Sequence, residues 1–149
     1  MQHIYIGADH AGFELKEKIK LFLKKEDRSV ADLGNTKYDL KDDYPDFAKK
    51  VAERVAKEGA LGILLCGTGH GVCIVANKIK GIRAVTVTST KDARLTREHD
   101  QSNILCLGGR TTSSGKARKI VKTWLNTPYS KEARHKKRIE KIVLIERGR

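Results

Sequence analysis

Short apolar runs alternate with amphipathic helical segments from one end of the 149-residue chain to the other. The run Gly62–Cys66 is apolar throughout, as expected of a strand that is buried on both faces. Further strands are predicted at residues 4–6, 29–33, 84–88 and 104–107. Helices are predicted over residues 13–23, 45–55, 72–78, 91–99 and 114–125, and from an N-cap at Ser130 to about Glu146. This alternation predicts one α/β domain over residues 1–149, a three-layer α/β/α Rossmann-like fold with a five-stranded parallel sheet and an extended C-terminal helix.

Composition narrows the class of protein. The chain is 39% hydrophobic and 33% charged, which is typical of a globular domain rather than of a disordered chain. No stretch is long and apolar enough to span a bilayer, and a strand begins almost at the N-terminus, so we expect neither a membrane segment nor a secretory signal. The three cysteines, Cys66, Cys73 and Cys106, form no C-x-x-C pair. This argues against a disulfide framework or a zinc site and favours a reducing, cytoplasmic compartment.

The formal net charge of +13 admits two interpretations. Such a surface attracts the phosphate backbone of nucleic acids, but a lysine-rich solvated surface carries the same charge without that function. Aromatic residues make up only 5% of the chain, so the stacking platforms that bind single strands are scarce. We therefore expect no nucleic-acid partner and keep a basic binding module as an alternative.

Candidate functional residues follow the predicted strands. In open parallel sheets, ligands bind beyond the carboxyl ends of the strands. The candidates selected in this way are Asp9, His10, Cys66, His99, Asp100 and Arg110. We expect these polar groups, which come from separate strands, to converge on one crevice.

A glycine-rich turn, Gly67-Thr68-Gly69-His70-Gly71, leads from the third strand into a helix. Glycines allow close approach of the backbone, and consecutive N–H groups at a helix start can hold an anion or a developing oxyanion. The pattern is neither G-x-G-x-x-G nor a P-loop, so neither a dinucleotide nor ATP is indicated. The alternative is a tight turn without a ligand.

Cys66 directly precedes these amides. A helix N-terminus favours the thiolate form of a cysteine, whereas the alternative is a small, buried apolar residue. We assign that buried role to Cys73 and Cys106.

The remaining candidates also have structural alternatives. Asp9 could cap a helix while His10 lies on the surface, and His99 could interact with the dipole of the helix that it ends. Arg134 and Arg138 are spaced i, i+4, so they share a helix face and could clamp a phosphate, or they could belong to a solvated basic helix.

These residues resemble those of a known family. From Ile4 to about Glu146 the chain resembles ribose-5-phosphate isomerase type B, within the family that also holds galactose-6-phosphate and allose-6-phosphate isomerases. The most specific matching segments, in chain order, are Gly7-Ala8-Asp9-His10-Ala11-Gly12, Asp43-Tyr44-Pro45, Cys66-Gly67-Thr68-Gly69-His70-Gly71, Ala76-Asn77-Lys78, Gly81-Ile82-Arg83-Ala84, Gly108-Gly109-Arg110, and Arg134-His135 with Arg138.

The resemblance implies a role for each candidate. Cys66 would move a proton between carbons 1 and 2 of the sugar through a cis-enediolate, with Thr68 orienting or polarising the thiol. The amides of residues 67–71 would stabilise the enediolate oxygens, and His99 would open the furanose ring as an acid. The substrate-binding residues would be Asp9, His10, Gly67, Gly69, His70, Gly71, Asp100, Arg110, Arg134 and Arg138. Asp9 would hold sugar hydroxyls, and His10 and the three arginines would hold the phosphate.

The resemblance also implies an assembly. The partner would be a small-molecule phosphosugar, with no metal or organic cofactor, and the protein would be a homodimer or a dimer of dimers whose site is shared between subunits. The chain itself hints at this through an apolar stripe on its last helix, which either a second chain or its own sheet could bury. The stripe consists of Ile139, Ile142, Val143 and Ile145.

Two positions depart from the family pattern. Asp100 stands where the family usually has asparagine; an ionised aspartate cannot donate a hydrogen bond and would repel a phosphate, so we hypothesise that a nearby cation compensates it. His70 stands where an apolar residue is common, and we expect it to face solvent. Three alternatives stay open: a six-carbon substrate (allose 6-phosphate or galactose 6-phosphate), a non-catalytic module that binds nucleic acid, and a catalytically inactive relative.

Overall fold

Five parallel strands form one sheet in the order β2-β1-β3-β5-β4, in a computed structural model that describes residues 1–148. The strands are β1 (Ile4–Ala8), β2 (Val30–Asp32), β3 (Leu61–Cys66), β4 (Ala84–Thr86) and β5 (Ile104–Gly108). The helices are α1 (His10–Lys25), α2 (Tyr44–Glu58), α3 (His70–Ala76), α4 (Thr90–Asp100), α5 (Ser114–Asn126) and α6 (Ala133–Arg147). The predicted alternation and the parallel sheet are confirmed, and the structure adds the strand order.

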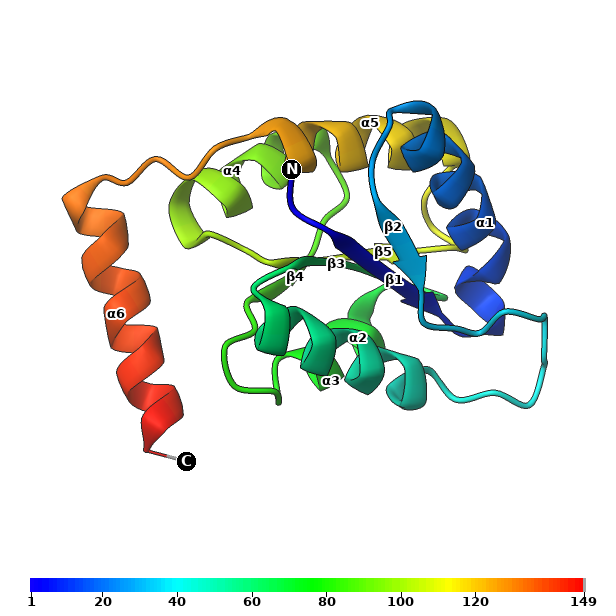
Figure 1. The fold of residues 1–149 in the computed structure, drawn as a ribbon, viewed down its shortest axis with the longest axis horizontal. Helices are drawn as coiled ribbons and strands as arrows, with labels where there is room; N and C mark the ends of the chain where they lie inside the picture. The colour runs from blue at the N-terminus through cyan, green and yellow to red at the C-terminus, as the bar shows by residue number, and fades with distance from the viewer. Residues whose placement is uncertain (149) are drawn as a thin grey trace.

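Helices cover both faces of the sheet (Figure 1). One face packs against α1, α4 and α5, and the other against α2 and α3. Within β3, Ile63 and Leu65 join the first of these two cores, whereas Leu64 and Cys66 join the second. Because successive side chains of a strand point to opposite faces, a strand between two helical layers must be apolar throughout. The prediction that the run Gly62–Cys66 is a strand buried on both faces is therefore confirmed, and so is the three-layer architecture predicted from the alternation.

The C-terminal helix α6 projects from the sheet and the helices that cover it (Figure 1). Helix α6 lies on the side of the molecule where the strands begin, and it packs beside α4. Its side chains Ile142, Leu144 and Ile145 are exposed. Of the predicted stripe, Ile142 and Ile145 are thus exposed, whereas Ile139 and Val143 are half-buried. The chain's own sheet therefore does not bury the stripe as a whole, and the exposed side chains are open to a second chain.

The start of α6 also differs from the prediction. Glu132, not Ser130, is the N-cap residue. The Ser130 hydroxyl lies 2.8 Å from the Nδ1 atom of His135 and accepts a hydrogen bond from the N–H of Glu132 at 3.3 Å. Ser130 therefore shapes the segment that leads into the helix, because its hydroxyl binds the buried ring of His135 instead of capping the first turn.

Candidate active site

The carboxyl ends of the three central strands lie side by side. In the register of the sheet, Ala8 pairs with Leu65, and Cys66 pairs with Gly108. The N–H of Gly109 donates to the carbonyl oxygen of Cys66 at 2.8 Å, which ties the segment after β5 to the end of β3. We call the residues gathered at this edge the carboxyl-edge region: Asp9, His10, residues 66–71 and Arg110. As predicted, these candidates come together.

The sulfur of Cys66 lies inside the turn that follows β3. Cys66 is only 4% exposed, and its Sγ accepts a hydrogen bond from the N–H of Gly69 at 3.2 Å. A donor directed at the sulfur stabilises negative charge there. The hydroxyl of Thr68, which was predicted to orient the thiol, accepts a hydrogen bond from the N–H of His70 at 3.3 Å. The hydrogen bond that the sulfur receives within the described chain thus comes from the backbone.

Gly69 holds this turn in shape. Its φ is +80°, and a Cβ atom there would lie 2.9 Å from the carbonyl carbon of Leu107. The hydroxyl of Thr86 donates to the carbonyl oxygen of Gly69 at 2.7 Å. Since a side chain would be strained by the positive φ and would also overlap β5, only glycine fits at this position.

Tyr44 is a neighbour of the turn that the sequence did not reveal. It is the first residue of α2, and a Cβ atom on Gly71 would overlap its ring. The segment Asp43-Tyr44-Pro45 was recognised as a helix start and as a family match, but nothing local relates residue 44 to residue 71. The two meet because α2 and α3 pack against each other on the same face of the sheet.

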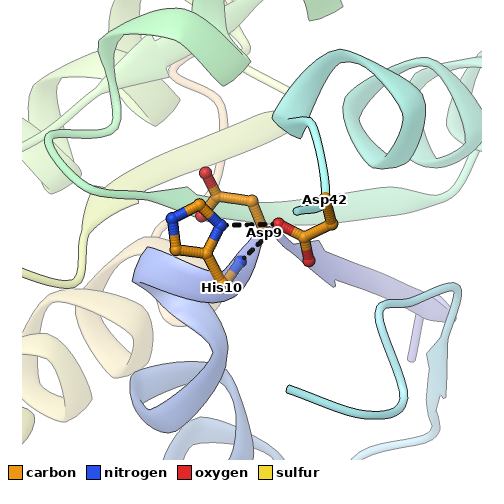
Figure 2. A group of neighbouring side chains, drawn as sticks. All are labelled: Asp9, His10 and Asp42. Atoms are coloured by element: carbon orange, nitrogen blue, oxygen red, sulfur yellow. Dashed lines mark hydrogen bonds and ion pairs between the residues drawn. The ribbon is translucent and has the colours of Figure 1, made fainter. Parts of the chain in front are cut away.

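Asp9, His10 and Asp42 form a cluster at the start of α1 (Figure 2). Asp9 caps the helix, because its Oδ1 accepts a hydrogen bond from the N–H of Gly12 at 3.1 Å. Asp42 Oδ1 accepts a hydrogen bond from the N–H of His10 at 2.9 Å and lies 2.7 Å from the ring nitrogen Nδ1. The ligand atoms of the three residues lie within 4.8 Å of one another, a spacing that a metal ion could use. These internal bonds already account for the cluster, and they show that His10 is held in place instead of lying free on the surface.

A cavity of about 440 Å³ opens beside His10. Its lining residues are His10, Ala11, Glu14, Leu15, Lys18, Tyr38, Gly109, Arg110, Thr112, Ser113 and Ser114. Cys66 is not among them, but Arg110 connects the cavity to the turn, since its N–H donates to the carbonyl oxygen of Gly67 at 3.0 Å. Two cations, Lys18 and Arg110, and several hydroxyls suit this cavity to a small anionic ligand.

His99 and Asp100 lie at the other end of the strands, next to the amino end of β5. Parallel strands require crossover connections, so α4 begins beyond the carboxyl end of β4 and returns to the amino end of β5. There the ring of His99 lies over the ring of His135 on α6, with centroids 4.3 Å apart and the planes inclined by 33°. We call His99, Asp100, Arg134, His135 and Arg138 the amino-edge region. The prediction that all candidates converge on one crevice is therefore wrong within a single chain.

The two arginines of the amino-edge region are exposed on α6. The Nε of Arg134 donates to a carboxylate oxygen of Glu132 at 2.8 Å. This bond holds the pKa of Glu132 below its usual range. Arg134 and Arg138 lie on the helix predicted for them, but neither lies in the carboxyl-edge region of the same chain.

Arg83 is a cation beside Asp100, but its contact is with the main chain of Asp100 and not with the carboxylate, so compensation of that charge stays a prediction. The Nε of Arg83 donates to the backbone carbonyl oxygen of Asp100 at 3.0 Å. Burial lowers the pKa of the Arg83 guanidinium, and the negative charges of Glu146 and Asp100 oppose that shift. His70, the other unusual position, is exposed, as expected.

All three cysteines are free thiols. Cys106 is fully buried, as predicted, and burial raises the pKa of its thiol. Cys73 is only half-buried, which corrects its assignment to the core. Hydrogen bonding to Cys106 outweighs the effect of burial and, with the help of Thr86, lowers the pKa of Cys73 to about 6. No helix among residues 1–148 is long and apolar enough to cross a membrane.

Comparison with known proteins gives consistent matches over almost the whole chain. The family model described as Ribose/Galactose Isomerase matches residues 4–142. The probable ribose-5-phosphate isomerase B of Mycoplasma genitalium is 46% identical, covering 97% of this chain and 96% of the relative. Ribose-5-phosphate isomerase B of Mycobacterium tuberculosis is 43% identical, with 97% and 90% covered. The crystal structure of the M. genitalium protein with bound ribulose-5-phosphate has a TM-score of 0.94, at 46% identity, over 97% of this chain and 96% of that one.

Proposed function

The chain belongs to the ribose/galactose isomerase family, and from this membership we propose that it interconverts ribose 5-phosphate and ribulose 5-phosphate, an aldose–ketose isomerisation. The similar structure with bound ribulose-5-phosphate supports a five-carbon substrate. One observation in this chain carries the proposal: the Cys66 sulfur accepts the Gly69 N–H in a turn that is joined by Arg110 to an anion-sized cavity. A cytoplasmic location is proposed from the three free cysteines.

Cys66 is the proposed base. In the open-chain aldose its sulfur takes the proton from C2, and the electron pair of that bond forms the C1=C2 bond of a cis-enediolate. Negative charge then develops on O1, where the backbone N–H groups of residues 67–71 stabilise it. The sulfur returns the proton to C1, the hydroxyl proton on O2 passes to O1, and C2 becomes the ketone carbon. No cofactor is needed, because only protons and one electron pair change place.

Ring opening and phosphate binding require the other candidates. His99 is the proposed acid that protonates the ring oxygen of the furanose. His10 and Arg110 hold the phosphate from the side of the cavity, and Arg134 and Arg138 complete the grip. Asp9 binds sugar hydroxyls through the oxygen that does not cap α1. Thr68 orients or polarises the Cys66 thiol from the same turn.

The separation of the two regions favours a homodimer or a dimer of dimers. His99, Arg134 and Arg138 belong to the amino-edge region, whereas Cys66 belongs to the carboxyl-edge region. A second copy that docks against the exposed apolar side chains of α6 would bring the two sets together. Burial of such a surface is the ordinary driving force for association. The site is then built twice in a symmetric dimer, each time from both chains.

An assay of the purified protein tests the function. Ribulose 5-phosphate formation from ribose 5-phosphate is followed for the parent and for Cys66→Ala, and we expect the variant to lose about three or more orders of magnitude in kcat. Cys73→Ala is the matched control, since it removes a thiol of the same molecule that has no role in the proposed reaction. Equal turnover by Cys66→Ala and the parent would reject the mechanism.

The same assay separates the alternatives. Allose 6-phosphate and galactose 6-phosphate are offered in parallel, and a higher kcat/KM for either would replace the five-carbon assignment. A protein that turns over none of the three sugars but binds RNA or DNA in a salt-dependent way would support the nucleic-acid-binding alternative.

A further inference from the structure

Asp42 has no role in the reaction proposed above, yet both of its side-chain oxygens and its main-chain N–H are hydrogen-bonded. It lies in the segment between β2 and α2, and its side chain is only 5% exposed. Its Oδ1 faces both the N–H and the Nδ1 of His10, at 2.9 and 2.7 Å. Its Oδ2 accepts a hydrogen bond from Nδ2 of Asn35 at 3.3 Å, and its own N–H donates to the carbonyl oxygen of Asp39 at 3.1 Å. A loop carboxylate is thus fixed against the first residue of α1.

This contact decides how the His10 ring is oriented. An ionised carboxylate only accepts hydrogen bonds, so Nδ1 of His10 is the nitrogen that carries a proton. The second ring nitrogen points away from Asp42 (Figure 2), and His10 is part of the cavity wall. Because the main-chain N–H of His10 is bound by the same oxygen, neither the ring nor the start of the helix can turn without breaking a charge-assisted bond.

The charges around the pair leave Asp42 ionised. Burial acts to raise its pKa, but the backbone N–H and ring of His10 and the amide of Asn35 outweigh burial, so the pKa lies below its ordinary value. The other ionisable groups near the pair are Asp9 at the helix cap, Glu14 and Lys18 on α1, Tyr38 in the loop and Arg110 after β5. The Tyr38 ring meets His10 edge-on, with centroids 6.4 Å apart.

We propose that Asp42 is a positioning residue, which holds His10 so that its Nε2 is presented to the phosphate group of a sugar phosphate in the cavity. The identity of that ligand rests on the proposed function, whereas the contact itself rests on the geometry of Asp42 and His10. Asp42 therefore acts on substrate binding through His10 and takes no part in proton transfer at the sugar carbons.

Three variants test the proposal in the ribose 5-phosphate assay. We expect Asp42→Ala to raise KM about tenfold, as for the loss of a charge-assisted hydrogen bond, while kcat stays within about threefold. Asp42→Asn keeps an oxygen that accepts hydrogen bonds from Nδ1 and from the main-chain N–H of His10. Its KM should therefore lie much closer to that of the parent than to that of Asp42→Ala. Asp46→Asn is the matched control, since it removes an exposed carboxylate four residues along the chain and should leave both constants unchanged.

A double-mutant cycle separates positioning from a general effect on the fold. If Asp42 acts only through His10, the Asp42→Ala, His10→Ala double variant has the KM of His10→Ala alone. The proposal would be overturned if the double variant raised KM by the product of the two single fold-increases. A lower kcat of Asp42→Ala with an unchanged KM would overturn it as well.

A measurement without substrate keeps the inference distinct from the proposed function. In ¹⁵N NMR spectra, we expect the parent to show His10 with its proton on Nδ1, and Asp42→Ala to shift that ring toward the Nε2 tautomer. A parent that turns over no ribose 5-phosphate would refute the function, whereas the tautomer result would still decide the role of Asp42. An unchanged His10 spectrum in the Asp42→Ala protein would refute the positioning role.

Discussion

The carboxyl-edge and amino-edge regions are built in opposite ways. At the carboxyl edge, Cys66 is buried in a turn whose backbone is bonded on every side, to Gly109, to Thr86 and to the sulfur itself. At the amino edge, Arg134 and Arg138 are exposed on a helix that extends away from the sheet (Figure 1). The first region is preorganised by one chain, whereas the second presents its functional groups outward.

The proposed chemistry needs both kinds of region. Stabilising a developing oxyanion requires donors that are already fixed before the reaction, and a turn on a buried strand supplies them. Gripping a phosphate requires long cationic side chains that reach across a gap, and exposed arginines supply those. A single chain therefore holds the two groups of candidate residues at opposite ends of its strands, and under the proposed function association of two chains is the step that would join them.

Mixed dimers provide the test with the largest expected effect. Cys66→Ala should lose about three or more orders of magnitude in kcat, and His99→Ala at least about a hundredfold. When the two inactive chains are co-expressed, half of the dimers are mixed, and each mixed dimer has one site with both an intact Cys66 and an intact His99. We expect about a quarter of the parent activity to return, which is measured as ribulose 5-phosphate formation per dimer.

The control for this experiment replaces one partner. Co-expression of Cys66→Ala with a chain that carries both Cys66→Ala and His99→Ala leaves no intact pair, so activity should stay at the residual level. If native mass spectrometry shows that mixed dimers form but no activity returns in the first mixture, the two regions do not share a site and the proposed shared active site is wrong.

The sequence predicts the carboxyl-edge region far better than the amino-edge region, for a topological reason. The turn after Cys66 is local, because its glycines, its thiol and the following helix are neighbours in the sequence. The position of His99 depends on the direction in which α4 crosses the sheet, and the side chain of His99 meets His135, 36 residues away, because α6 packs beside α4. Asp42 is missed for a similar reason, since its partner His10 lies 32 residues earlier.

Gly69→Ala tests the preorganisation of the carboxyl-edge region and should have the second-largest effect. An alanine at φ +80° costs about 1–2 kcal/mol in backbone strain, and its Cβ would also overlap Leu107. The turn must shift and carry its N–H away from the Cys66 sulfur, so we expect a loss of about a hundredfold in kcat.

Gly59→Ala is the matched control for that variant. Gly59 has a φ of +62°, but no atom lies within 4 Å of its would-be Cβ, and it ends α2 away from the turn. The control should lower the free energy of unfolding by about 1 kcal/mol, as an alanine at a left-handed position does, and leave kcat unchanged. Equal losses of kcat in the two variants would mean that stability, and not the geometry of the turn, limits the activity.

Replacing Cys73, on α3, should change kcat least of all. This variant tests whether a lowered pKa alone is enough to make a cysteine catalytic. The pKa of Cys73 is lowered to about 6, so its alkylation rate by iodoacetamide should rise through a midpoint near pH 6 and level off above pH 7. Ionisation leaves no unpaired acceptor behind: the Ala84 carbonyl that the thiol faces at 3.3 Å also accepts a hydrogen bond from Asn77 Nδ2 at 2.9 Å. Cys106, buried and with a raised pKa, should stay unlabelled in the native protein and serves as the internal reference in peptide mass mapping.

We expect Cys73→Ala to keep kcat within about threefold of the parent despite the acidity of the lost thiol, because proton transfer requires a base positioned at the sugar carbons as well as one that is ionised. A midpoint near the ordinary cysteine value of about 8.5 would contradict the lowered pKa, and a large loss of kcat would give the second thiol a part in the chemistry that we propose for Cys66.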